Sequence, residues 1–138
     1  MNNLNVDYRF SVAPMMGVTT PSARYMYRLI SKEAVLFTEM IASQALHRGD
    51  YKKLLRKENI EKPVILQVGG SDISLLKYST SLANKFDYQG INLNVGCPSK
   101  KVSQGKMGAC LMKEAELVRD CLSCLLYTSP SPRDDELS

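Results

Sequence analysis

Several features common in proteins are missing from this sequence. It has no tryptophan and a single histidine, His47, and none of its apolar runs reaches the roughly 20 residues that a membrane-spanning helix needs. The N-terminal segment MNNLNVDYRF has neither the basic start nor the apolar stretch of a secretory signal, and it is too poor in arginine for a transit peptide. We therefore expect a soluble, cytoplasmic protein with no membrane partner.

Cysteine is sparse as well. The four cysteines are Cys97, Cys110, Cys121 and Cys124, and without a secretory signal they do not indicate a disulfide framework. Cys121 and Cys124 form one CxxC pair, but a closed zinc site needs two further ligands at comparable spacing. We therefore predict no metal site, and we expect the pair to be buried on an apolar helix.

The composition is that of an ordinary globular protein. Of the 138 residues, 44% are hydrophobic and 23% are charged, which is enough apolar material for one core and hence one domain. The formal net charge is +4. A basic excess of this size suits a polyanionic partner such as RNA, but it is equally common on surfaces that have no such partner.

Short apolar runs alternate along the chain with longer amphipathic ones, which is typical of strands and helices in turn. Thr20 and Asp72 are predicted N-caps, and Pro21 suits the first turn of a helix. The predicted strands cover residues 10–14, 35–40, 63–70 and 90–96, and the predicted helices cover 21–31, 43–47, 73–86 and 113–126. Four strand–helix units in this order predict an α/β fold with a parallel sheet.

Two elements carry predictions about the core. In the first helix, apolar side chains recur at the spacing of one helical face. Ala23, Met26, Tyr27 and Ile30 form this face, and we expect it to be buried. Strand 63–70 is apolar along nearly its whole length, so both of its faces are expected to be covered.

The segment YTSPSPRDDELS, residues 127–138, interrupts the pattern at the point where a fifth strand is due. It is rich in Ser and Pro, then acidic, and has no apolar periodicity, so we expect a disordered tail. Its abrupt start resembles vector or adaptor sequence more than a native terminus. The expected organisation is an N-terminal extension over 1–8, a single α/β region over 9–126, and this tail.

Polar residues occur where the predicted strands end, which is where functional groups collect in parallel α/β folds. Asn92 and Asn94 alternate with apolar residues, so both amides point to one side of their strand, the interior in a barrel. Gln67 is another amide at the end of an apolar strand. Such amides suit the edge of a pyrimidine or flavin ring, but they also bond to neighbouring backbone in ordinary turns.

Cys97 lies on the turn that follows this Asn-bearing strand. Gly96 permits a close approach of backbone to a ligand, and Pro98 stiffens the turn. A thiol in this place can reach a bound substrate as an acid or a nucleophile. The ordinary alternative is that Cys97 is a small buried residue.

Two basic segments are candidates for contact with nucleic acid. Lys100, Lys101 and Lys106 lie in the loop after Cys97, where they could hold phosphates. The second segment spans residues 50–57 and is less specific. Its basic residues, with the one just before it, are Arg48, Lys52, Lys53, Arg56 and Lys57. Lysines on loops are most often simply solvated, so they add to the argument only beside Cys97.

The blocks FSVAPMMGVTT, LFTEM, PVILQVGGSD, INLNVGCPS and KMGACLM follow one another at natural spacing between Arg9 and Leu126. Together they resemble the tRNA-dihydrouridine synthases, most closely the A-type branch. The resemblance implies the first half of an FMN-binding TIM (β/α)8 barrel, with NADPH as the reductant. Pro14, Met15 and Met16 would pack against the flavin, and Gln67 would bind its ring.

The same resemblance implies roles for the residues after the fourth strand. The substrate would be tRNA, in which specific uridines become 5,6-dihydrouridine. Cys97 would protonate C5 of the uracil while the reduced flavin passes hydride to C6. Asn94 and Gly96 would contact the uracil, and Lys100 and Lys101 would lie near the tRNA.

The sequence departs from the family's pattern in two respects. Thr20 and Pro21 stand in a region where the family usually has an acidic residue. A TIM barrel needs eight strands and about 250 residues, whereas four strands are predicted here. We therefore predict that the chain itself has no synthase activity and that the function belongs to the full-length protein. A flavin-dependent reductase of free pyrimidines and a catalytically inactive RNA-binding fragment remain as alternatives.

Overall fold

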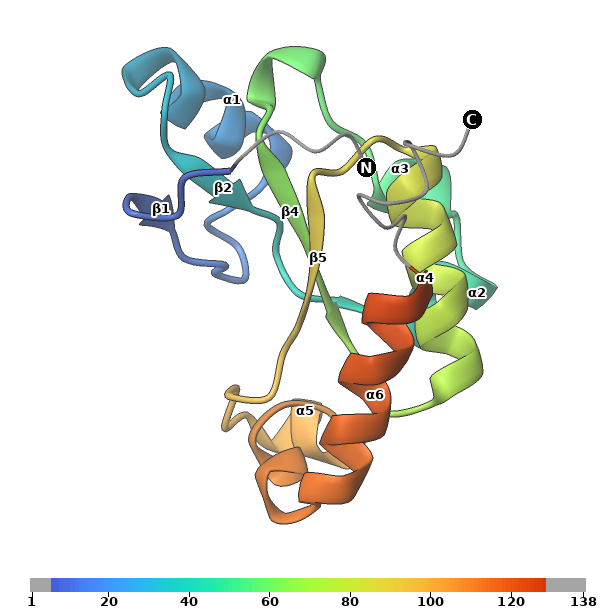
Figure 1. Ribbon diagram of the computed structural model, residues 1–138. Helices are drawn as coiled ribbons and strands as arrows, with labels where there is room; N and C mark the ends of the chain where they lie inside the picture. Colours follow the sequence, from blue (N-terminus) through green and yellow to red (C-terminus); the bar gives the residue numbers. More distant parts are fainter. Residues whose placement is uncertain (1–5, 129–138) are drawn as a thin grey trace.

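A computed structural model describes residues 6–128, in which five short parallel strands alternate with helices (Figure 1). The strands are β1 (Ser11–Val12), β2 (Val35–Phe37), β3 (Ile41–Ala42), β4 (Val64–Gly69) and β5 (Gly90–Leu93). The helices are α1 (Pro21–Ile30), α2 (Ser43–Arg48), α3 (Tyr51–Leu54), α4 (Ile73–Lys85), α5 (Lys100–Gln104) and α6 (Ala115–Thr128), and the 3₁₀ segments are η1 (Asn59–Glu61) and η2 (Gly108–Lys113). This alternation confirms the predicted α/β class.

The sheet is open, and β4 lies at its centre. β1 pairs with β2, β2 with β4, and β4 with β5, all in parallel. Within residues 6–128, β1 and β5 each have one edge without a partner strand. The chain therefore forms a partial barrel, as predicted for half of a TIM barrel.

β3 was not predicted, and it is the second half of an interrupted strand. Phe37 of β2 is the register partner of Ile65, and Ile41 of β3 is the partner of Val68. Both lie along the same edge of β4, because β5 occupies the other edge from Ile65 to Val68. Ile41 comes four residues after Phe37, whereas its partner Val68 comes three residues after Ile65 on β4. The extra residue makes residues 38–40 a bulge. The number of strand–helix units therefore remains four, as predicted.

The core lies between the sheet and the helices on one side of it. α4 packs against α2 and runs beside α6 (Figure 1). β4 is buried from Val64 to Gly69, which confirms that both of its faces are covered. Cys121 and Cys124 on α6 are also buried, as predicted for this pair.

Both predicted helix caps are present. Oγ1 of Thr20 accepts a hydrogen bond from the backbone N–H of Ala23 at 3.3 Å, at the start of α1. Oδ1 of Asp72 accepts from the backbone N–H of Leu75 at 3.1 Å, at the start of α4. These bonds satisfy amide groups that have no partner within the helix.

The prediction for the buried face of α1 was right for two of its four residues, since Ala23 and Tyr27 are partly buried and Tyr27 packs against the core. Met26 and Ile30 are 51% and 76% exposed, whereas Arg24 and Arg28 are buried. Periodicity of apolar residues could not reveal this, because the two fully buried side chains of the helix are charged. These arginines can be buried because oxygen atoms beneath the helix satisfy their guanidinium groups.

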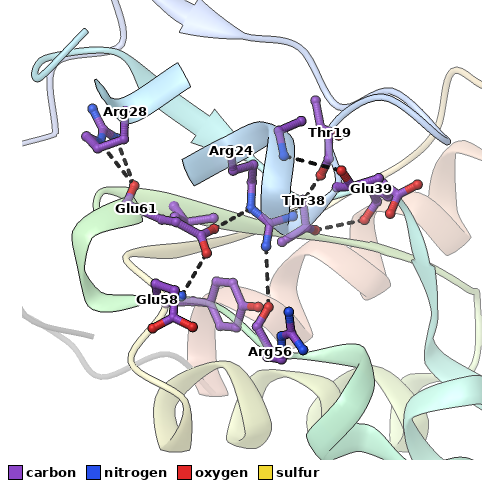
Figure 2. A network of polar contacts seen from close by, with 12 residues as sticks. Thr19, Arg24, Arg28, Thr38, Glu39, Arg56, Glu58 and Glu61 are labelled. Atoms are coloured by element: carbon purple, nitrogen blue, oxygen red, sulfur yellow. Dashed lines mark hydrogen bonds and ion pairs between the residues drawn. The ribbon is translucent and has the colours of Figure 1, made fainter. Parts of the chain in front are cut away.

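A buried ion pair joins α1 to the segment that precedes β4 (Figure 2). Nε of Arg24 lies 2.7 Å from Oε2 of Glu61, and the two side chains are 3% and 0% exposed. Arg24 also donates to the carbonyl oxygen of Thr19, and Oε1 of Glu61 accepts from the backbone N–H of Glu58, both at 2.7 Å. Arg28 donates to the carbonyl oxygen of Glu61 at 2.9 Å. Both charges of the ion pair are therefore hydrogen-bonded as well, and the Arg28 guanidinium is satisfied by carbonyl oxygens.

Two helices, α3 and α5, were not predicted, and α6 extends beyond its predicted end. α3 lies in the basic stretch, where Asp50 caps it by accepting from the backbone N–H of Lys53. Residues 100–104 were predicted as loop and form α5, which the carbonyl oxygen of Ser99 begins. α6 continues two residues into the predicted tail, to Thr128, beyond Leu125, its last buried residue among those whose burial is described. The rest of that tail, and residues 1–5, lie outside the described residues.

None of the helices in residues 6–128 is long and apolar enough to cross a membrane.

The ion pair gives a first test. Replacing Glu61→Gln leaves the guanidinium of Arg24 buried without its counter-charge, so we expect the free energy of unfolding to fall by about 3–5 kcal/mol. Urea unfolding of the chain, followed by circular dichroism, measures this change. Glu114→Gln is the matched control, because Glu114 is exposed and is expected to change stability by less than about 0.5 kcal/mol. Equal stability of the two variants would contradict the structural role of the pair.

Candidate functional site

A cavity of about 680 Å³ opens at the carboxyl ends of the strands, and we call it the strand-end cavity. Its walls come from the segments after β1 and β5, the bulge between β2 and β3, and β4. The lining residues are Pro14, Met16, Met40, Ala42, Gln67, Asn94, Cys97, Ser99, Lys101, Val102 and Met107. The strand ends therefore converge on one site, as predicted, and its size is that of a small-molecule or cofactor site.

Six of the nine predicted site residues line the strand-end cavity, namely Pro14, Met16, Gln67, Asn94, Cys97 and Lys101. The other three, Met15, Gly96 and Lys100, are exposed. Each of them is adjacent in sequence to a lining residue and lies outside the lining itself. The contacts assigned to them with flavin, uracil and tRNA stay predictions.

Three amides form a hydrogen-bonded row beside the cavity. Gln67 on β4 is the register partner of Asn92 on β5, so their side chains point to the same face of the sheet. Nε2 of Gln67 donates to Oδ1 of Asn92 at 2.7 Å, and Oε1 of Gln67 accepts from Nδ2 of Asn94 at 3.0 Å. Asn92 and Asn94 therefore point to one side, which confirms the alternation argument.

Asn94 also fixes the turn that carries Cys97. Its Oδ1 accepts from the backbone N–H groups of Gly96 and Cys97, at 3.1 and 3.0 Å. The carbonyl oxygen of Cys97 accepts from the backbone N–H of Ala109 at 2.9 Å. The half-buried thiol is thus fixed from two sides at the cavity wall. Asn94 performs the ordinary turn-forming role left open by the sequence, and its contact with uracil stays a prediction.

Thr38, which the sequence argument did not single out, positions Gln67. Its side chain is buried in the bulge, and Oγ1 accepts from the backbone N–H of Gln67 at 3.0 Å. The same hydroxyl donates to the carbonyl oxygen of Glu39 at 2.8 Å. It occupies the place where an unbroken strand would offer a carbonyl group to β4. A threonine in an apolar run looks like ordinary strand, so only the pairing register reveals this role.

The segment after β1 is attached to the bulge by Glu39. Oε1 of Glu39 accepts from the backbone N–H of Gly17 at 2.6 Å. Gly17 has φ +73°, a left-handed conformation that favours glycine. Thr19 closes the same turn by bonding both the N–H and the carbonyl group of Met15 at 3.1 Å (Figure 2 labels Thr19 and Glu39). Glu39 is therefore an internal tether of the site.

Met40 and Met107 are further cavity residues that the sequence argument did not single out. Both sulfur atoms approach Gly69 so closely that a Cβ there would lie 2.8 and 2.9 Å from them. Glycine at this position therefore makes room for both thioethers. The one available signal was that Met40 is the last residue of the predicted strand 35–40.

The lining suits the flavin that the resemblance implies. Pro14, Met16, Met40 and Met107 offer apolar surface that can adapt to a flat ring. The Gln67 amide has one N–H and one lone pair beyond those it uses in the amide row. Within residues 6–128, no cluster of three or more His, Cys, Asp or Glu side chains could hold a metal ion.

The family model for dihydrouridine synthase (Dus) matches residues 11–132, most of the chain. The chain therefore belongs to the dihydrouridine synthase family. This membership agrees with the partial parallel barrel and with a cysteine at the mouth of its strand-end cavity.

Relatives named tRNA-dihydrouridine(20/20a) synthase are similar to it over most of its length. The Yersinia pestis protein is 48% identical over 117 residues, which is 85% of this chain and 34% of the relative. The Xylella fastidiosa protein is 45% identical over 119 residues, 86% of this chain and 36% of the relative. The Synechocystis protein is 46% identical over 115 residues, 83% and 34% respectively. The chain thus spans about a third of the length of these curated relatives.

The turn that carries Cys97 gives a second test. Gly108 has φ +70°, and a Cβ there would lie 2.5 Å from the carbonyl oxygen of Cys97. We expect Gly108→Ala to destabilise the chain by about 1–3 kcal/mol and to increase the alkylation rate of Cys97, because the turn must move. Thermal unfolding and peptide mapping after iodoacetamide treatment measure the two effects.

Gly96→Ala is the matched control for that variant. A Cβ at Gly96 would meet no atom within 4 Å, and its φ lies outside the left-handed region. We expect it to keep wild-type stability. If Gly108→Ala also kept wild-type stability and thiol reactivity, the packing of Gly108 against Cys97 would not control the turn.

Proposed function

We propose that the full-length protein is a tRNA-dihydrouridine synthase, which reduces uridine in tRNA to 5,6-dihydrouridine with FMN as cofactor and NADPH as reductant. The observation that carries the proposal is Cys97, fixed at the strand-end cavity by Asn94. Family membership and the names of the relatives support it. Those names point to uridines 20 and 20a as the substrates.

The residues of the cavity divide into a cofactor side and a substrate side. Pro14, Met15 and Met16 would lie against the flavin, and Gln67 would bind the polar edge of its ring. When bound, the flavin supplies hydride chemistry that no side chain can perform. The apolar lining would exclude water from the ring, and the amide row would keep Gln67 in one orientation.

Cys97 is the residue to which we assign the proton. Its S–H would donate to C5 of the uracil, and the turn formed by Asn94 would keep the sulfur on that path. Polarisation of the ring carbonyl groups makes C6 electron-poor, so amide donors near the base favour the reaction. Asn94 and Gly96 are the nearest groups of the turn that could contact the base.

The uridine must leave its stack before it can enter the cavity. This costs a few kcal/mol, which contacts between the protein and the RNA backbone offset. Lys100 and Lys101 open α5 beside the cavity and are exposed, so they are the groups that would meet the phosphates nearest to the reacting base. By itself the 138-residue chain should not turn over, because a complete parallel barrel needs eight strands.

A chimera tests the proposal without requiring the partial barrel to act alone. Residues 9–126 replace the matching segment of the Yersinia pestis relative, and dihydrouridine formed in an unmodified tRNA transcript is measured with FMN and NADPH present. We expect the chimera to be active and Cys97→Ser to lower the rate by about 10²-fold or more, as for loss of a general acid. The flavin absorbance should be retained in that variant.

Cys110→Ser is the matched control, because a serine hydroxyl can keep the bond that the Cys110 thiol makes to the carbonyl oxygen of Met107. It should remain active. Turnover of free uracil in preference to tRNA would replace the proposal with a free-pyrimidine reductase. RNA binding that is independent of flavin and of Cys97, without any turnover, would replace it with a binding module.

A further inference from the structure

A smaller recess adjoins the strand-end cavity, and a second recess adjoins the first. The first has a volume of about 260 Å³ and shares Met16, Met40 and Ala42 with the cavity. It extends past Leu54 to Pro21 at the start of α1. The second, of about 340 Å³, shares Pro21 with the first. Shared lining residues therefore link the cavity that holds Cys97 to the first recess, and the first recess to the second.

The far recess is lined by Arg56 and Lys57, and we call Lys52, Lys53, Arg56 and Lys57 the α3 basic segment. Lys52, Lys53 and Arg56 are exposed. None of these four side chains takes part in an ion pair with a carboxylate of residues 6–128. Their positive charge is thus available to a partner.

Lys57 lies among charges of both signs. It is half-buried, and its Nζ lies 5.2 Å from the centre of the Tyr88 ring. Burial and then the nearby Lys62 lower its pKa from the usual value. The neighbouring carboxylates are largely engaged, since Glu61 pairs with Arg24 and Asp87 pairs with Lys62. Glu58 is the acidic side chain that remains at the recess.

A second basic group lies at the other end of this surface. Lys101 lines the strand-end cavity, and Lys100 precedes it at the start of α5. Lys101 and Cys97 line the strand-end cavity and Arg56 lines the far recess, so basic side chains occur at both. The phosphate of a single nucleotide can contact only one of these two basic groups. An RNA strand carries a negative phosphate at every nucleotide and can contact both.

We propose that the α3 basic segment is a second contact surface for the phosphate backbone of the RNA substrate, reached from the strand-end cavity along the two recesses. This rests on the function proposed above and states how the RNA on the far side of the reacting base is held. Arg56 and Lys57 contact the backbone directly, and Lys52 and Lys53 add to the attraction. These contacts are independent of base identity, so they increase affinity without selecting the uridine.

The test is the salt dependence of tRNA binding by the 138-residue chain. Fluorescence anisotropy with an unmodified tRNA transcript, without flavin or NADPH, gives the dissociation constant at several salt concentrations. Each lost phosphate contact lowers the slope of log K against log [salt] by roughly 0.7–0.9, so Arg56→Ala/Lys57→Ala should lower it by about 1.4–1.8. Lys32→Ala/Lys77→Ala removes two exposed lysines elsewhere and should leave the slope unchanged.

A charge-preserving variant separates charge from folding. Arg56→Lys/Lys57→Arg should keep the wild-type slope, even if its midpoint of thermal unfolding changes. An unchanged slope for Arg56→Ala/Lys57→Ala, or no binding of tRNA by the wild-type chain, would overturn the proposal. Equal affinity for polyglutamate would overturn it too, because the segment would then attract any polyanion.

The result is distinguishable from a failure of the proposed reaction. Cys110→Ser, at a residue outside the lining of the strand-end cavity and of the far recess, should bind tRNA as the wild type does. If the chimera fails to form dihydrouridine while the Arg56/Lys57 slope falls as expected, the reductase assignment fails and the RNA surface stands. If the chimera is active and the slope does not change, the surface alone is wrong.

Discussion

The buried pair of Arg24 and Glu61 connects α1 to the segment that precedes the central strand β4. It lies under α1, where a helix of this kind ordinarily buries apolar side chains. Through the carbonyl oxygen of Thr19, Arg24 reaches the turn that carries Met15, and through Glu61 it reaches the start of β4 (Figure 2). The β1 side of the strand-end cavity, which Met16 lines, is thus connected to an ion pair that is not part of the cavity lining. A buried charge that loses its partner is costly, so this contact is close to obligatory for the fold.

Three amide side chains beside the cavity form hydrogen bonds with one another and with the turn that carries Cys97. Gln67 bonds to both Asn92 and Asn94, and Asn94 bonds to the turn of Cys97. Such a network fixes each member in one orientation and satisfies groups that would be expensive to bury alone. The spare capacity of Gln67 and the thiol of Cys97 are what it leaves for a ligand. A site built in this way is organised before its cofactor and substrate arrive, which reduces the cost of binding them.

The sequence was sufficient for the fold class, the two helix caps, the buried central strand and the convergence of the strand ends. Each of these follows from local rules: periodicity, cap chemistry and the direction of parallel strands. The failures have a common cause, which is that contacts between distant segments replaced the local preference. Arg24 is buried because Glu61 lies opposite it, and the hydroxyl of Thr38 enters the ladder because the strand is interrupted there. Neither partner can be identified from its own neighbours in the sequence, and the same is true of Met107 at the cavity wall.

The bulge at residues 38–40 also exchanges the inner and outer positions of its strand. Register partners share a face, so Phe37 shares that of Ile65, and an unbroken alternation would place position 41 on the same face. With one extra residue, Met40 and Ala42 line the cavity instead, and Ile41 packs against the core. The strand therefore changes parity in the middle, with odd-numbered residues inside before the bulge and even-numbered residues inside after it. Removing a single residue there would turn the core side of β3 toward the cavity, so the length of this short step specifies the site as firmly as any side chain in it.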